Sequence, residues 1–158
     1  MKLPKFPFSR IRQTIWAIPI MLALAVAQSP AYATQKPITL TVGGLSVRAE
    51  VAATQESRER GLMHRRKLGK NSGMLFIFKQ PGYHGMWMKN TFIPLSVAFI
   101  DKKGMILNIA EMEPHSEVTH SAAGPALYAL EMNAGWFRKN NIAMGAAIKG
   151  LGKAPASQ

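Results

Sequence analysis

The chain has 158 residues, 47% of them hydrophobic, and its 20 Lys and Arg outnumber its 8 Asp and Glu, which gives a formal net charge of +12. This length and composition predict one globular domain, and the lack of cysteine excludes disulfides, a thiol nucleophile, thiolate metal ligands and a lipidated N-terminal cysteine. The positive charge favours an anionic component of the cell envelope over nucleic acid as partner, and a solubilising charge with no dedicated partner is the alternative.

Residues 1–33 are predicted to be a secretory signal peptide cleaved after Ala33. A short apolar run, residues 15–27, follows a leader without acidic residues, and Ala31-Tyr32-Ala33 gives the small-x-small cleavage pattern. The run is shorter than the ~20 residues of a spanning helix, so no transmembrane anchor is expected after cleavage, the uncleaved anchor being the alternative. The leader cations are Lys2, Lys5, Arg10 and Arg12.

Cleavage leaves a single β-rich domain, residues 34–150, and a flexible C-terminal tail, residues 151–158. A domain of this size buries about two-thirds of the surface that its unfolded chain exposes, which is enough for a core without disulfides. An exported protein without disulfides suits the bacterial periplasm or the cell exterior. We expect it to be a monomer there.

The first elements expected are a hairpin turning at Gly43-Gly44, a short helix capped by Thr54 and weakened by Gly61, and a buried apolar strand. The glycine pair suits the twist of two paired strands, and the Thr54 side chain can bond the first turn of the helix. The expected bounds are strands 38–42 and 45–51, helix 55–63, loop 65–73, strand 74–78 and turn 79–83.

The stretch from His84 to Asp101 concentrates aromatic, sulfur and polar residues. If residues 85–91 are extended, alternation places His84, Met86, Met88 and Asn90 on one face. Pro94 cannot donate a ladder hydrogen bond and should mark a strand break. A hairpin follows, with strands 96–100 and 105–111 around the turn Asp101-Lys-Lys-Gly104.

The remaining elements are short. Asn133 can cap one or two helical turns in which Trp136 and Phe137 pack inward. Short strands, dense turns and two short helices predict a mainly β fold, a small antiparallel sandwich or partly closed barrel with two short helices. The expected bounds are loop 112–124 with a short strand at 118–121, strand 125–132, helix 134–140 and strand 142–148.

Five segments, in this order, closely resemble the motifs of the domain-of-unknown-function 192 family: Gly61–Met63, Gly73–Phe78, Trp87–Thr91 with Ile93–Leu95, Phe99–Asp101 and Gly124–Glu131. The resemblance covers residues 50–148. It implies a small, mostly β protein of bacteria or archaea, often exported, with no established biochemical activity. The chain departs from the family at Ser96, where members often carry an acidic residue, and a shared carboxylate role there is not expected.

One cluster combines an aromatic face with a cation, an amide and carboxylates, which suits a glycan or carboxylate ligand. Alternatively, Lys89 pairs with Glu131 or Asp101 across strands, and Asn90 satisfies backbone groups before Pro94. The candidate ligand-binding residues are Trp87, Lys89, Asn90, Thr91, Asp101 and Glu131.

Two further sets of residues could bind a metal ion, but each fits that role less well than the preceding cluster fits a ligand. His84, Met86 and Met88 offer soft ligands for Cu(I), but methionine also fills irregular cores, and packing is the favoured explanation. The second set could hold Zn or Ca, but Pro114 interrupts it and its spacing fits no established ligand pattern. Its members are Glu111, Glu113, His115, Glu117 and His120. We therefore expect no metal and no other cofactor.

No nucleophile elbow, phosphate-binding loop or zinc-protease motif occurs in the sequence. The leading prediction is a non-enzymatic exported binding protein for a small or polymeric envelope ligand. The alternatives are an enzyme of unrecognised class that uses His84, Lys89 and Asp101, and a periplasmic copper-binding protein.

Overall fold

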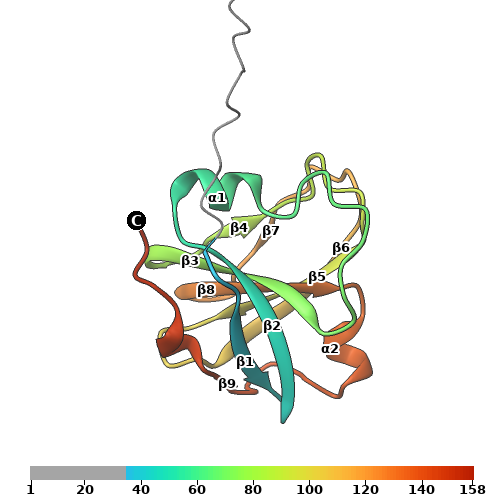
Figure 1. The fold of residues 1–158 in the computed structure, drawn as a ribbon. Coiled ribbons are helices and arrows are strands. Elements are labelled where there is room, and N and C mark those ends of the chain that lie inside the picture. The colour runs from blue at the N-terminus through green and yellow to red at the C-terminus, as the bar shows by residue number, and fades with distance from the viewer. Residues whose placement is uncertain (1–34) are drawn as a thin grey trace, which may run out of the picture. The chain divides into compact units, whose positions relative to one another are not determined.

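The computed structural model of the protein describes residues 35–158, and the predicted signal peptide lies outside the described residues. Seven strands form one curled sheet and two short strands form a separate ribbon (Figure 1). Within residues 35–158, no helix has the length and apolar character needed to cross a membrane. The elements are β1 (Ile38–Val42), β2 (Leu45–Ala52), α1 (Gln55–Arg60), β3 (Ser72–Gly82), β4 (Gly85–Met86), β5 (Leu95–Ile100), β6 (Ile106–Met112), β7 (His120–Ser121), β8 (Ala126–Asn133), α2 (Trp136–Lys139), β9 (Ile148–Lys149) and the 3-10 turn η1 (Leu151–Lys153).

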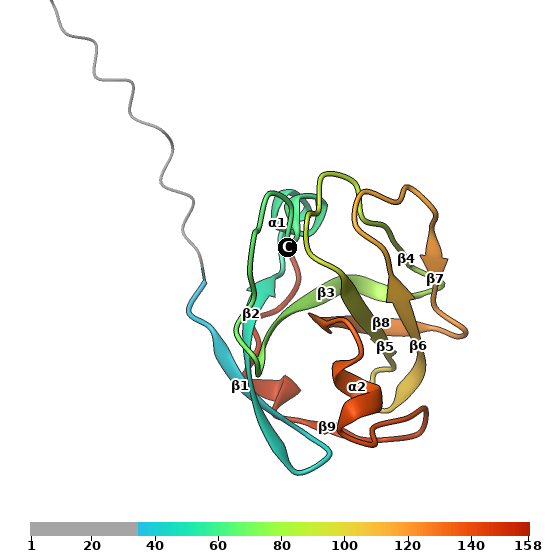
Figure 2. The same cartoon turned by 90° about the vertical axis from the view of Figure 1, so that its right-hand side faces the viewer.

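The order of strands in the large sheet is β6-β5-β8-β3-β2-β1-β9. Neighbours are antiparallel except β2 and β3, which are parallel and joined by a crossover that contains α1. The sheet curls, as Figure 2 shows, until the segment before β9 reaches the start of β6, where Ile106 N donates to Ala146 O at 2.9 Å. The mainly β, partly closed barrel is therefore confirmed.

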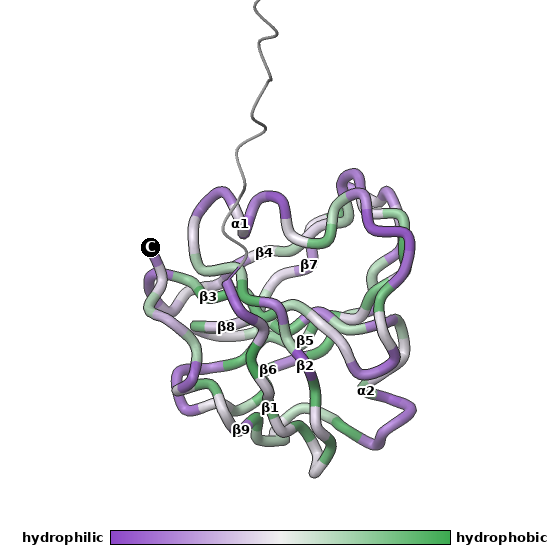
Figure 3. Tube along the Cα trace, viewed as in Figure 1, coloured by the Kyte–Doolittle hydropathy of each residue, from purple (hydrophilic) through white to green (hydrophobic). Residues whose placement is uncertain are grey.

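The sheet buries apolar side chains on both faces, while hydrophilic residues gather on α1 and on the outer loops (Figure 3). One core contains Leu130 and Met132 of β8, and the other, which includes Leu62 just after α1 and Met86 of β4, contains Ala129. Because side chains alternate along a strand, Glu131 points to the second layer, between the sheet and α1.

Three local predictions are confirmed. The Gly43-Gly44 turn joins β1 and β2. Thr54 caps α1, because its Oγ1 accepts from Ser57 N at 3.1 Å, and the helix ends at Arg60 because Gly61 adopts a φ of 45°. The Asp101–Gly104 turn closes with Gly104 N donating to Asp101 O at 3.0 Å.

Extended structure over residues 85–91 was wrong beyond Met86. Asn90 adopts a left-handed φ of 54°, and Thr91 N donates to Met88 O at 3.0 Å, which turns the chain instead of extending it. The predicted turn at 79–83 was also misplaced, because β3 continues to Gly82 through an irregular pairing with β8 after Ile77.

The C-terminal helix and strand also differ from expectation. Asn133 does not cap a helix; it stays in β8 opposite Leu95, and Gly135 precedes α2 in a left-handed conformation instead. The strand expected at 142–148 shrinks to Ile148–Lys149, because the preceding residues turn and bond the start of β6.

The C-terminal residues, expected to form a flexible tail, make defined contacts with the domain. Gln158 N donates to Ala53 O at 2.8 Å, and Arg58 Nη1 donates to Ser157 Oγ at 2.9 Å. The last residues therefore lie against the start of α1.

Ser96 is buried and connects three segments. Its Oγ donates to Glu111 Oε2 at 2.7 Å and accepts from Gly135 N at 2.8 Å. We expect Ser96→Ala to lower the free energy of unfolding by about 1 kcal/mol, because the buried hydroxyl and its two part-buried hydrogen bonds are lost, while Gly135 N can still donate to Glu111 Oε2. Urea denaturation would measure it against Ser46→Ala, which removes an exposed hydroxyl from β2, and equal losses in the two variants would contradict the expectation.

Candidate ligand-binding site

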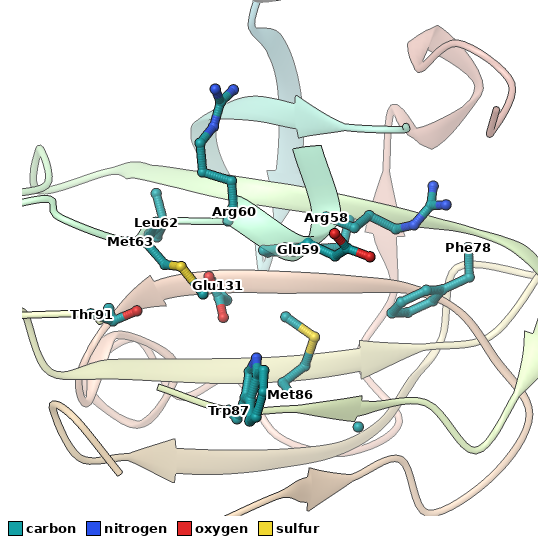
Figure 4. A pocket seen from close by; sticks show the side chains of 13 residues that line it. Arg58, Glu59, Arg60, Leu62, Met63, Phe78, Met86, Trp87, Thr91 and Glu131 are labelled. Carbon is teal, nitrogen blue, oxygen red and sulfur yellow. The ribbon is translucent and has the colours of Figure 1, made fainter. Parts of the chain in front are cut away.

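A pocket of about 220 Å³ lies between the second face of the sheet and the segments that cover it. Its floor is formed by β3 and β8, and its walls by the end of α1, the turn that follows it, and the β4 region (Figure 4). The lining residues are Arg58, Glu59, Arg60, Gly61, Leu62, Met63, Phe76, Phe78, Gly85, Met86, Trp87, Thr91 and Glu131.

Glu131 is the buried polar group of this pocket. It lies on β8 between Met74 of β3 and Val97 of β5, and only 3% of its surface is exposed. No residue among 35–158 forms a hydrogen bond or ion pair with its carboxyl, and burial raises the pKa of Glu131 to about 8. At neutral pH the carboxyl is thus mostly protonated, and it can donate one hydrogen bond and accept others.

Apolar and aromatic side chains surround this carboxyl. Figure 4 shows Glu131 between Met63 and Met86, with Trp87 beside them. Trp87 remains 45% exposed, and Lys89 Nζ lies 5.3 Å from its ring centroid. The pocket therefore offers one aromatic face near its mouth and one hydrogen-bonding group at its floor.

The rim formed by α1 is charged. Arg58 is held by three backbone carbonyls, because its Nη1 donates to Ala53 O at 2.6 Å and to Ile77 O at 3.0 Å, and its Nη2 donates to Gln158 O at 3.2 Å. Glu59 accepts a hydrogen bond from Gln55 Nε2 at 2.9 Å. With Arg60, the rim carries two cations against one carboxylate.

The structure brings three of the six predicted ligand-binding residues together, since Trp87, Thr91 and Glu131 all line the pocket. Lys89 contacts the Trp87 ring and, among the described residues, pairs with neither Glu131 nor Asp101, so the alternative of a cross-strand ion pair was wrong.

The other two candidates, Asn90 and Asp101, do not line the pocket. Asn90 O accepts from His64 N at 2.8 Å, and its side chain is exposed. Asp101 Oδ1 accepts from the backbone N–H groups of Lys103 and Met105, at 2.8 Å each, so the carboxylate holds the β5–β6 turn.

The residues proposed as soft metal ligands do not share a cavity. His84 stacks on Phe78 with ring centroids 3.7 Å apart, and its Nε2 lies 2.9 Å from Gln80 O. Met88 is 1% exposed in the core, and only Met86 lines the pocket. These contacts support the packing explanation.

The acidic and histidine set is also dispersed. Glu111 bonds Ser96 and Gly135 and lies 3.6 Å from Arg138. Within the described range, no three His, Asp or Glu residues gather closely enough to share a metal ion.

Sequence reasoning missed Leu62 and Met63 of the opposite wall, and it missed Phe76 of β3 at the floor. One signal was present, because Gly61–Met63 is among the segments that resemble the family motifs. Alternation along single strands could not place that segment beside Glu131, because the contact depends on the path of the α1 crossover.

The fold and site define a small β half-barrel with a covered pocket beside one core. The DUF192 family profile (Uncharacterized ACR) matches residues 38–150, and the chain belongs to this family.

Two solved structures are similar. A protein of unknown function from Novosphingobium aromaticivorans DSM 12444 is 35% identical with a TM-score of 0.70, over 77% of this chain and 90% of that one. A protein from Sinorhizobium meliloti 1021, described as a candidate transcription regulator, is 34% identical with a TM-score of 0.69, over 75% and 96%. The search of curated proteins gives no match.

Proposed function

We propose that the protein is an exported binding protein whose pocket holds one neutral, hydroxyl-rich ring of a cell-envelope glycan. The observation that carries the proposal is Glu131, a buried carboxyl that opens into the pocket without a hydrogen-bond partner among the described residues. A buried polar group without a partner is unfavourable, so a ligand that satisfies this carboxyl gains affinity from it.

The chemistry of the pocket matches such a ring. A protonated carboxyl both donates and accepts, as a hydroxyl does, so the two form complementary hydrogen bonds. The exposed face of Trp87 offers a platform for the apolar face of a ring, and Leu62 and Met63 supply apolar walls.

The size and charge of the pocket also support a single neutral ring as the ligand. Its volume of about 220 Å³ is below the roughly 300–1,000 Å³ of pockets for drug-sized ligands, which favours a single ring. Arg58 and Arg60 at the rim disfavour a cationic ligand, although a cation would otherwise pair with an ionised Glu131.

The envelope as source of the ligand rests on the leader sequence. Its cations, apolar run and Ala31-Tyr32-Ala33 pattern direct the chain to the periplasm or the exterior, where glycans are abundant. The basic composition suits a polymer that also carries anionic groups.

Tryptophan fluorescence titration with glucose, N-acetylglucosamine and their short oligomers tests the proposal, with Trp87→Phe identifying the Trp87 signal. At least one sugar is expected to bind, and Glu131→Ala is expected to weaken that binding about tenfold or more, because the buried hydrogen bonds are lost. The matched control is Tyr83→Ala, which removes an exposed aromatic residue outside the pocket. If no sugar changes the Trp87 signal, or both variants bind equally, the proposal is wrong.

A further inference from the structure

A second cluster lies directly beyond one wall of the pocket and consists of Phe92, His64, Arg66 and His115; we call it the Phe92 corner. The Phe92 ring is 39% exposed. The His64 and His115 rings lie 5.7 and 5.2 Å from it between centroids, and Arg66 Cζ lies 5.9 Å from its centroid. Three potential donors of hydrogen bonds therefore surround one exposed aromatic ring.

The backbone fixes this arrangement. His64 N donates to Asn90 O at 2.8 Å, and His115 N donates to Thr91 O at 3.1 Å, so two distant loops are tied to the segment that carries Phe92. His64, Asn90 and His115 all adopt left-handed conformations, with φ between 54° and 62°. Left-handed conformations are uncommon outside glycine, although Asn and His adopt them more readily than most residues, and here they turn the backbone on either side of Phe92.

No carboxylate among the described residues neutralises Arg66 at the Phe92 corner. Arg65 pairs with Glu50 at 2.5 Å, whereas the neighbouring Arg66 has no carboxylate partner among residues 35–158. Glu113 and Glu117 flank His115 in sequence, but they are exposed and neither forms an ion pair with a described residue.

An arginine lying over an aromatic ring keeps its guanidinium edge available, and that edge matches an oxyanion in two parallel hydrogen bonds. Because the ring restricts the guanidinium, less conformational freedom is lost when the anion binds. The two imidazoles can donate further hydrogen bonds to the same group.

We propose that the Phe92 corner binds a carboxylate or phosphate group of an acidic envelope polymer, with Arg66 as the principal contact. The Phe92 corner is separate from the Glu131 pocket, yet the two share a wall. Met63 and Thr91 line the pocket, and the next residues, His64 and Phe92, form the corner. A polymer that carries a neutral ring beside an acidic group can therefore occupy both.

Titration of the full chain at low ionic strength with D-glucuronate and with glycerol 3-phosphate tests this site and separates the two sources of the oxyanion. Binding would be followed by NMR of the Arg66 side-chain N–H and the His64 and His115 ring protons. At least one probe is expected to shift these signals. Arg66→Gln is expected to weaken its binding about tenfold, because charge-assisted hydrogen bonds are lost.

The matched control is Lys67→Gln, which removes one charge from the same loop. Lys67 is not part of the Phe92 corner, so this variant is expected to change the affinity for the probe less than about twofold. If neither probe binds, the site is absent. If Arg66→Gln and Lys67→Gln weaken binding equally, the probe responds only to the overall charge of the loop, and the proposal is wrong. Phe92→Leu, which keeps the loop apolar while removing the ring, is expected to weaken binding as well. Sugar binding reported by Trp87 is measured separately in Arg66→Gln, so failure of this site and failure of the proposed function are distinguishable.

Discussion

Raising the pH from about 5 to about 8 is expected to lower the free energy of unfolding by several kcal/mol through Glu131. The pKa of this carboxyl rises from its ordinary value of 4.5 to about 8 in the folded protein because burial disfavours the charge. Below pH 4.5 both states hold the proton. Between the two values the folded state keeps a proton that the unfolded state has released, so stability decreases as the pH rises.

Urea denaturation of the wild-type protein and Glu131→Gln at pH 5, 6.5 and 8 measures this effect. Glutamine has nearly the same shape and carries no ionisable proton, so the two proteins should have similar stability at pH 5, and the variant should be the more stable at pH 8. Glu113→Gln, at an exposed position, serves as the control and should follow the wild type. Parallel pH profiles for wild type and Glu131→Gln would show that the carboxyl titrates normally in the folded protein.

Replacing Gly73 with alanine is expected to destabilise the protein by about 3 kcal/mol, because the added methyl group overpacks the contact between β3 and β8. A Cβ at this position would collide with the backbone oxygen of Glu131 and lie 2.5 Å from Met132 Sδ. The thioether can rotate, but the carbonyl belongs to the neighbouring strand, so relief requires β8 to move. The same displacement would shift Glu131 at the pocket floor.

Thermal and urea denaturation of Gly73→Ala and Gly152→Ala provide the comparison. A Cβ at Gly152 has no atom within 4 Å and requires no left-handed backbone, so this variant should resemble the wild type. Equal stability of the two variants would mean that β3 and β8 adjust without loss, and the contact would then not constrain the position of Glu131.

Local chemistry made several elements predictable from the sequence. The Gly43-Gly44 turn, the Thr54 cap and the Asp101–Gly104 turn each depend on residues close together in the chain, and each is present. The errors arose where distant partners decide the conformation. Asn133 could cap a helix by its nature, but pairing with Leu95 and a 2.9 Å bond from its Nδ2 to Gly69 O keep it in β8.

The candidate site was predictable to the extent that its residues share a recognisable segment. Trp87 and Thr91 lie in one motif and Glu131 ends another, so composition and resemblance selected all three. The same reasoning included Asp101, whose carboxylate accepts hydrogen bonds from the backbone of the β5–β6 turn. It also missed Met63, because no local pattern records that the α1 crossover passes over β8.

The parallel pairing of β2 and β3 has an evolutionary consequence. Two parallel neighbours cannot be joined by a tight turn, so the chain must leave the sheet and return across one of its faces. In this protein the crossover connection consists of α1 and the turn after it, which form a wall of the cavity over β8. Any descendant that keeps this strand order inherits covering chain on that face, so the side chains that line the cavity can be exchanged while the framework stays the same.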